Sequence, residues 1–217
     1  MEAGSVGAPA EDLEAVARRF SGAWPYLELI AAFNEIEDPL DPRVVEAYWV
    51  GSSLLEGIPA PLLLSAIGEH PDLRLGGGSQ LEQAVNAGGV AHHSFHVFAV
   101  YPWLNLLRSG KREPALTVLD RCRIRWGCIE AIEGAKVVVR SRPLGFEGRD
   151  LVLLEEHEEQ AYCSLEEVGF VEDLSRGDLV SLHWDWICDR LDAGAVASLE
   201  HFTARSIDAV NATTGFT

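Results

Sequence analysis

The chain has 217 residues, a formal net charge of −17 at pH 7 and a mean hydropathy of +0.05. This length fits one large domain or two small ones, and 47% hydrophobic residues are enough to form a sizeable core. The negative charge argues against nucleic acid and anionic membranes as partners, because both require a basic face. The acidic first residues lack an apolar signal core, and no apolar run reaches the length of a membrane span. We therefore expect a cytoplasmic protein.

Several common site motifs are missing from the sequence. The four cysteines have no CxxC spacing, which argues against a zinc ribbon or a thioredoxin motif. There is no GxSxG elbow for a serine hydrolase. The glycine-rich stretch 73–80 lacks the spacing of a phosphate-binding loop and is predicted to be a flexible connection. Structural disulfides are not expected in a reducing compartment.

The first half of the chain has the periodicity and the end signals of α-helices. The best-marked helix starts at Asp41, a favourable N-cap, followed by Pro42 at the first helical position, and it ends at Gly51. Tyr48 and Trp49 fall on its apolar face, which predicts that both are buried. Further helices are predicted over residues 11–20, 24–33, 59–67, 81–107 with a break at residue 102, and 114–121.

Three histidines, His92, His93 and His96, lie within one predicted helix. His92 and His96 are spaced i and i+4, so a regular helix would place them on one face as a candidate metal pair. The glutamate of the HExxH motif is missing, and the sequence assigns no further ligand. An ordinary helix face, with one histidine exposed and another hydrogen-bonded in the core, remains the alternative.

From Cys122 onward the sequence changes to short β-type runs broken by glycines. Glu133-Gly134 is typical of a hairpin turn, residues 179–183 form a strand, and Asp192 caps a final helix. Residues 155–160 are predicted to be a charged loop or a short exposed helix. Short strands with glycine turns favour a small barrel. The predicted fold is therefore α+β: a helical domain over 11–120, then an OB-like β-barrel with a C-terminal helix over 121–211.

Two segments of the second half carry a family resemblance. The first runs from a cysteine through glycine and isoleucines to an acidic-Gly turn, and the second is a Gly-Asp strand that ends in histidine. Together they resemble the HypC/HupF family of [NiFe]-hydrogenase assembly chaperones. The matching residues are Cys122, Gly127, Ile129, Ile132, Glu133, Gly134, Gly177, Asp178, Val180, Leu182 and His183. Through AWPYLELIAA, HHSFHVFAVYPW and SLHWDWICDRL, the whole chain also resembles an uncharacterised actinobacterial family associated with hydrogenase gene clusters.

The HypC/HupF resemblance implies a function and a site. In that family the matching cysteine and histidine hold the iron that carries cyanide and carbon monoxide, so Cys122 and His183 are the expected metal ligands. The implied role is transient iron binding or delivery, with a hydrogenase large subunit or another maturation protein as partner, and it is not enzymatic. This chain departs from the family in three ways. Cys122 is internal, Trp184, Asp185 and Trp186 follow the histidine, and the chain between the two segments is longer, with an acidic stretch at 155–167. We expect these two tryptophans to contact the partner.

The chemistry of the residues fits this expectation. A thiolate and an imidazole suit a soft iron centre. Neighbouring arginines are expected to favour the thiolate of Cys122 and to attract an anionic iron–cyanide group, and an aspartate is expected to orient His183. These supporting residues are Arg121, Arg123, Arg125, Asp185 and Asp189.

Two other functions remain open from the sequence. In the first, Cys122 is a buried strand residue, His183 hydrogen-bonds at a barrel end, and the protein is a metal-free structural partner or accessory subunit of a hydrogenase. In the second, the protein is a metalloenzyme that uses His92, His93 and His96. Cys128 is expected to be a core residue in each case.

Overall fold

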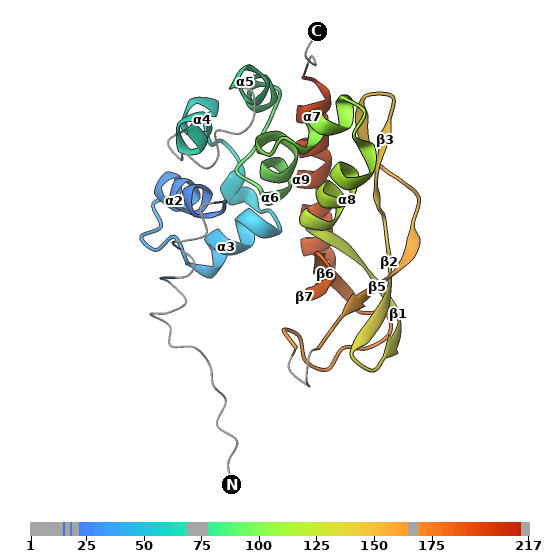
Figure 1. The fold of residues 1–217 in the computed structure, drawn as a ribbon. Helices are drawn as coiled ribbons and strands as arrows, with labels where there is room; N and C mark the ends of the chain where they lie inside the picture. Colours follow the sequence, from blue (N-terminus) through green and yellow to red (C-terminus); the bar gives the residue numbers. More distant parts are fainter. Residues whose placement is uncertain (1–14, 16–17, 19–21, 69–77, 165–168, 214–217) are drawn as a thin grey trace.

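A computed structural model of the protein describes residues 22–68, 78–164 and 169–213, together with Ala15 and Arg18. Helices come first, a five-stranded closed barrel follows, and a long helix ends the chain (Figure 1). The predicted α+β fold is therefore confirmed. The helix predicted over 11–20 lies outside the described residues, apart from those two positions. Among the described helices, none is long and apolar enough to cross a membrane.

The helical part matches its predicted elements closely, with one additional interruption. Residues 87–92 separate two helices within 81–107, and the expected break at residue 102 is present. Residues 78–80, which we expected in a loop, begin a helix instead, while the rest of that loop lies outside the described residues. The helices are α2 (Trp24–Phe33), α3 (Pro42–Trp49), α4 (Ala60–Gly68), α5 (Gly78–Asn86), α6 (His93–Phe95) with a π-helical turn (His96–Val100), α7 (Trp103–Arg108) and α8 (Arg112–Cys122), with a 3₁₀ turn at Ser53–Leu55.

Helix α3 begins as its sequence predicts. The Asp41 carboxylate accepts a hydrogen bond from the backbone N–H of Arg43 at 2.9 Å. Tyr48 is buried as expected, whereas Trp49 is only half-buried. Gly51 follows the helix with φ +99°, and a Cβ atom there would lie 2.1 Å from the ring of Phe202. Only glycine allows α3 and the C-terminal helix to approach this closely.

The barrel consists of β1 (Arg125–Glu133), β2 (Lys136–Ser141), β5 (His157–Tyr162), β7 (Trp186–Leu191) and β6 (Leu179–His183), in that order around the barrel. Strand β6 pairs with β1 and closes it, and β5 and β7 form its one parallel pair. This arrangement fits the expected OB-like barrel. Gly134, with φ +65°, forms the predicted turn between β1 and β2.

Strand β5 corrects the prediction of a charged loop or exposed helix over 155–160. Its outer positions, such as Glu158 and Gln160, are exposed, while Ala161 is buried in the barrel core. Glu159 is only partly exposed and receives two hydrogen bonds from the buried guanidinium of Arg125, both 3.1 Å long. The strand is thus stabilised by an ion pair and by pairing with β2, although its composition is that of a solvated segment.

Two elements of the second half pack against the helical half. The hairpin of β3 (Leu144–Glu147) and β4 (Asp150–Leu153) is separate from the barrel and buries Leu144 and Leu151 in the helical core. Helix α9 (Ala193–Asn211) starts at Asp192, whose carboxylate accepts from Ala195 N–H at 2.8 Å as predicted. It runs along the helical half and buries Phe202 there (Figure 1). The two halves therefore share a hydrophobic core.

Candidate metal site

Cys122, His183 and His93 meet at the junction of the two halves. One donor atom of each lies within 4.8 Å of the other two. Cys122 is the last residue of α8 and does not open a strand as we expected, His183 ends β6, and His93 begins α6. The structure thus brings together the two residues that the resemblance selected and adds one histidine from the second candidate group.

The other two histidines of that group are not among the three donors, although the ring centre of His96 lies 6.4 Å from that of His93. His92 has an extended backbone before α6, where its ring accepts from Ser94 N–H at 3.2 Å and stacks on Phe202. His96 lies in the π-helical turn and bonds through Nδ1 to the Tyr26 hydroxyl at 3.0 Å. The helical spacing that should place them on one face does not apply, because His92 precedes the helix. The two rings bond to different partners, and neither belongs to the cluster of three donors.

His93 is fixed by hydrogen bonds at both ring nitrogens. Its Nε2 lies 2.7 Å from the carbonyl oxygen of Cys122, so Nε2–H donates. Its Nδ1 lies 3.2 Å from the hydroxyl of Tyr48 and accepts. Burial, together with His96 and His183, lowers the pKa of His93 well below its ordinary value, so the ring is neutral at pH 7.

His183 is half-buried between aromatic rings. Its ring centre lies 5.4 Å from that of His93 and 5.7 Å from that of Trp49. Burial and the nearby Arg125 lower its pKa, so this imidazole is also neutral at pH 7. The Nε2 atom is buried and has no hydrogen-bond partner among the described residues. A neutral imidazole with an unused nitrogen is a suitable metal ligand.

The Cys122 thiol is protonated, contrary to expectation. Burial raises its pKa to about 11. The arginines that we expected to favour the thiolate bind other groups: Arg123 pairs with Asp120 at 3.0 Å, Arg125 with Glu159 at 3.1 Å, and Arg121 with Asp185. Their charges are compensated by these carboxylates, so burial decides the pKa of the thiol.

The aspartates expected to orient His183 are engaged elsewhere. Asp185 pairs with Arg121, and an Asp189 oxygen accepts from Arg190 N–H at 2.8 Å. The ring contacts with His93 and Trp49 position His183 instead. The hydrogen bonds and ion pairs of the described residues therefore do not include the expected contact of either aspartate with His183.

Trp184 is presented to solvent by a strained turn. Its φ is +53°, unusual for a bulky residue, and its side chain is 41% exposed. Arg125 donates to its carbonyl at 2.5 Å, and its N–H donates to Arg121 O at 2.7 Å. Trp186 is partly covered, with Tyr162 at 5.4 Å between ring centres. Of the two tryptophans expected to contact a partner, Trp184 is the more exposed to solvent.

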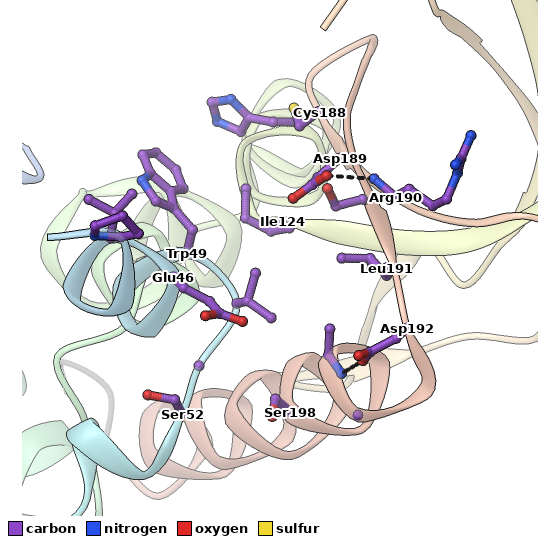
Figure 2. A pocket seen from close by; sticks show the side chains of 18 of the residues that line it. Glu46, Trp49, Ser52, Ile124, Cys188, Asp189, Arg190, Leu191, Asp192 and Ser198 are labelled. Atoms are coloured by element: carbon purple, nitrogen blue, oxygen red, sulfur yellow. Dashed lines mark hydrogen bonds between the residues drawn. The ribbon is translucent and has the colours of Figure 1, made fainter. Parts of the chain in front are cut away.

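A cleft of about 1170 Å³ lies beside His183, between α3, β7 and the start of α9 (Figure 2). Trp49 and His183 both line it. Its walls are mainly apolar and carry a few carboxylates. They include Leu40, Val45, Glu46, Ile124, Asp189 and Leu191.

The fold and the site define an α+β protein in which a two-histidine, one-cysteine donor cluster lies where a helical half meets an OB-like barrel. The chain belongs to DUF6390, a family of unknown function whose profile matches residues 2–216. No curated protein matches the chain. No protein of solved structure matches it either.

The sequence predicts all three donors as candidate metal ligands, but it assigns them to two alternative sites. Cys122 and His183 belong to one, and His93 belongs to the other. His93 was grouped with its neighbours in the chain, because nothing local indicates that its ring turns toward a residue 29 positions later. Trp49 was treated as a core residue only. The adjacency of His92 and His93 indicates that the three histidines do not form one site. Consecutive residues do not lie on the same face of a helix, so His92 and His93 must point in different directions.

Proposed function

We propose that this protein binds a metal ion through Cys122, His183 and His93, and that it holds iron during [NiFe]-hydrogenase assembly. In this role it is a binding or delivery protein and not an enzyme. Its partner is a hydrogenase large subunit or another maturation protein. The iron and the partner rest on the resemblance to the HypC/HupF chaperones, and the ligand set rests on the geometry of the site.

The observation that carries the metal proposal is the convergence of one thiol and two imidazoles, whose donor atoms lie within 4.8 Å of one another. The Nε2 atom of His183 is also buried without a hydrogen-bond partner among the described residues, as are the Nε2 atoms of His92 and His96 outside the cluster. A buried ring nitrogen without a hydrogen bond costs about 1–3 kcal/mol. Of the three described histidines with such a nitrogen, only His183 belongs to the donor cluster. A metal ion at the centre of the cluster would satisfy this nitrogen and offset its cost.

The protonation states fit reversible loading. Both imidazoles are neutral, and binding displaces one proton, from the Cys122 thiol to solvent. His93 must also exchange one of its two hydrogen bonds for the metal, while the other continues to orient the ring. Three protein donors leave coordination positions open. The lost proton and the lost hydrogen bond both oppose metal binding, so the ion is expected to bind reversibly. Reversible binding is what a protein that takes up and delivers a metal requires.

The test is metal analysis of protein purified without oxygen and loaded with Fe²⁺. We expect one bound ion per chain, lost in Cys122→Ser and in His183→Ala and weakened in His93→Phe, with folding unchanged by circular dichroism. Cys128→Ser is the matched control, since Cys128 lies in β1 outside the cluster. Hydrogenase activity in the host should fail with the same variants. Iron binding that survives in both Cys122→Ser and His183→Ala would refute the proposal.

A metal-free structural partner of a hydrogenase is the second candidate. Both nitrogens of His93 are already hydrogen-bonded, and the Cys122 thiol is protonated, as in an ordinary buried cluster. This alternative predicts no stoichiometric metal and normal hydrogenase maturation in Cys122→Ser. The same set of variants therefore separates the two functions.

A further inference from the structure

We propose that the cleft between α3, β7 and α9 is the route by which a divalent cation reaches the three donors, and that the Trp49 indole closes its inner end. This inference rests on the proposed metal site. It also narrows the cargo of that site to a metal cation, as opposed to an anionic iron–cyanide group.

The first argument is where Trp49 lies. His183 lines the cleft, whereas His93 and Cys122 are not among its lining residues. Trp49 lines the cleft too, and its ring centre lies 4.4 Å from that of His93 and 5.7 Å from that of His183. The indole therefore lies between the cleft and His93, the one fully buried donor. A cation arriving from the cleft meets His183 and Trp49 before it meets His93.

The second argument is that the indole has room to move. Trp49 is the last residue of α3 and is only half-buried, so it is held less firmly than the buried Tyr48 beside it. The adjacent cleft of about 1170 Å³ is large enough to receive an indole side chain. A rotamer change of a partly exposed residue is fast compared with local unfolding.

The third argument is the sign of the charge in the cleft. Glu46 on α3 and Asp189 on β7 point into it from opposite walls (Figure 2). Arg190 also lines the cleft, but its guanidinium bonds to Asp178 at 3.1 Å and to the carbonyls of residues 172 and 173. The resulting negative field attracts a cation and repels an anion. Carboxylates are weaker ligands than thiolate for soft metals, so the ion moves inward.

The experiment is stopped-flow binding of Co²⁺ to the full chain without oxygen, followed by the charge-transfer absorption of the cobalt–thiolate bond. Trp49→Ala should speed both association and dissociation, because the indole no longer closes the route, and any change in Kd reports the loss of its ring contacts with His93 and His183. Val45→Trp, which narrows the cleft without touching a donor, should slow both. Glu46→Gln with Asp189→Asn should slow association and reduce its salt dependence. Glu158→Gln, on the exposed face of β5, is the charge control.

The outcomes separate this inference from the proposed function. If wild type binds Co²⁺ but Trp49→Ala and Val45→Trp both associate at the wild-type rate, the ion enters elsewhere and the inference is overturned. If wild type gives no cobalt–thiolate absorption, the metal site itself is refuted. Pentacyanoammineferrate(II), an iron–cyanide anion with one exchangeable position, should not bind to the cluster. Stoichiometric binding of that anion, lost in His183→Ala, would overturn the assignment of a cation.

Discussion

The buried ion pair between Arg125 and Glu159 makes a quantitative prediction about stability. The Arg125 side chain is 1% exposed and that of Glu159 is 15% exposed. Arg125 donates twice to Glu159 and also to the carbonyls of Asp120 and Trp184, so it joins α8, the barrel and the turn beside the metal site. Burial alone would raise the pKa of Glu159, but Arg125 and a hydrogen bond from Ser141 hold that pKa below its ordinary value.

Arg125→Met should therefore destabilise the protein strongly. Removing one partner leaves a carboxylate buried without compensation, which typically costs about 3–5 kcal/mol. For a chain of this length, that corresponds to a fall in melting temperature of roughly 6–20 °C. The double variant Arg125→Met/Glu159→Gln should recover part of the loss, because no charge is left unpaired. Urea and thermal unfolding at neutral pH, followed by circular dichroism, measure both.

The control lies in the same barrel. Arg140 pairs with Glu130 at 2.8 Å, but its side chain is 47% exposed. Arg140→Met should leave the unfolding midpoint almost unchanged, since solvent screens an exposed pair. If Arg125→Met costs less than about 1 kcal/mol, Arg125 is behaving as a surface residue, and the reasoning about the barrel interior is wrong.

Three further predictions concern protonation and close packing. Because the pKa of Cys122 is about 11, Co²⁺ affinity should rise about tenfold per pH unit between about pH 7 and pH 9, and Cys122→Ser should lose this slope in titrations. Burial lowers the pKa values of His92 and His96 to about 4, so on acidification these histidines are protonated in the unfolded chain before they are protonated in the folded one. The free energy of unfolding should therefore fall by about 2 kcal/mol per histidine by about pH 5. In His96→Phe the fall should be smaller, because one of the two histidines is missing. Gly51→Ala should cost about 2–4 kcal/mol in urea unfolding, because φ is +99° and the added methyl meets a phenylalanine ring, whereas Gly68→Ala, with open space, should be nearly neutral.

Local signals in the sequence were sufficient for most of the elements. Asp41 and Asp192 cap their helices with side-chain hydrogen bonds to nearby N–H groups, which involve only the next few residues. Local sequence patterns likewise predict a helix over 24–33 and a strand over 179–183, which are the bounds of α2 and β6. Strand β5 was missed because its outer face is charged and because Glu159 is compensated by Arg125, a residue 34 positions away. Composition alone cannot distinguish a paired charge from a solvated one.

The site was predicted in parts, and its assembly was not. Cys122 and His183 followed from the resemblance, and His93 followed from a histidine cluster. Their convergence depends on packing the helical half against the barrel, which no local pattern reports. The pKa of Cys122 was misjudged for a related reason. Its neighbouring arginines are close in sequence, but carboxylates of α8, β5 and the β6–β7 turn bind their guanidinium groups.

X-ray absorption at the zinc edge is the most direct test of the central claim, that Cys122, His183 and His93 hold one metal ion. Protein loaded with one Zn²⁺ should show one sulfur at about 2.3 Å and two imidazole nitrogens at about 2.0–2.1 Å. Cys122→Ser should remove the sulfur, and His93→Phe and His183→Ala should each remove one nitrogen. A shell of oxygens only, or a sulfur that persists in Cys122→Ser, would contradict the account.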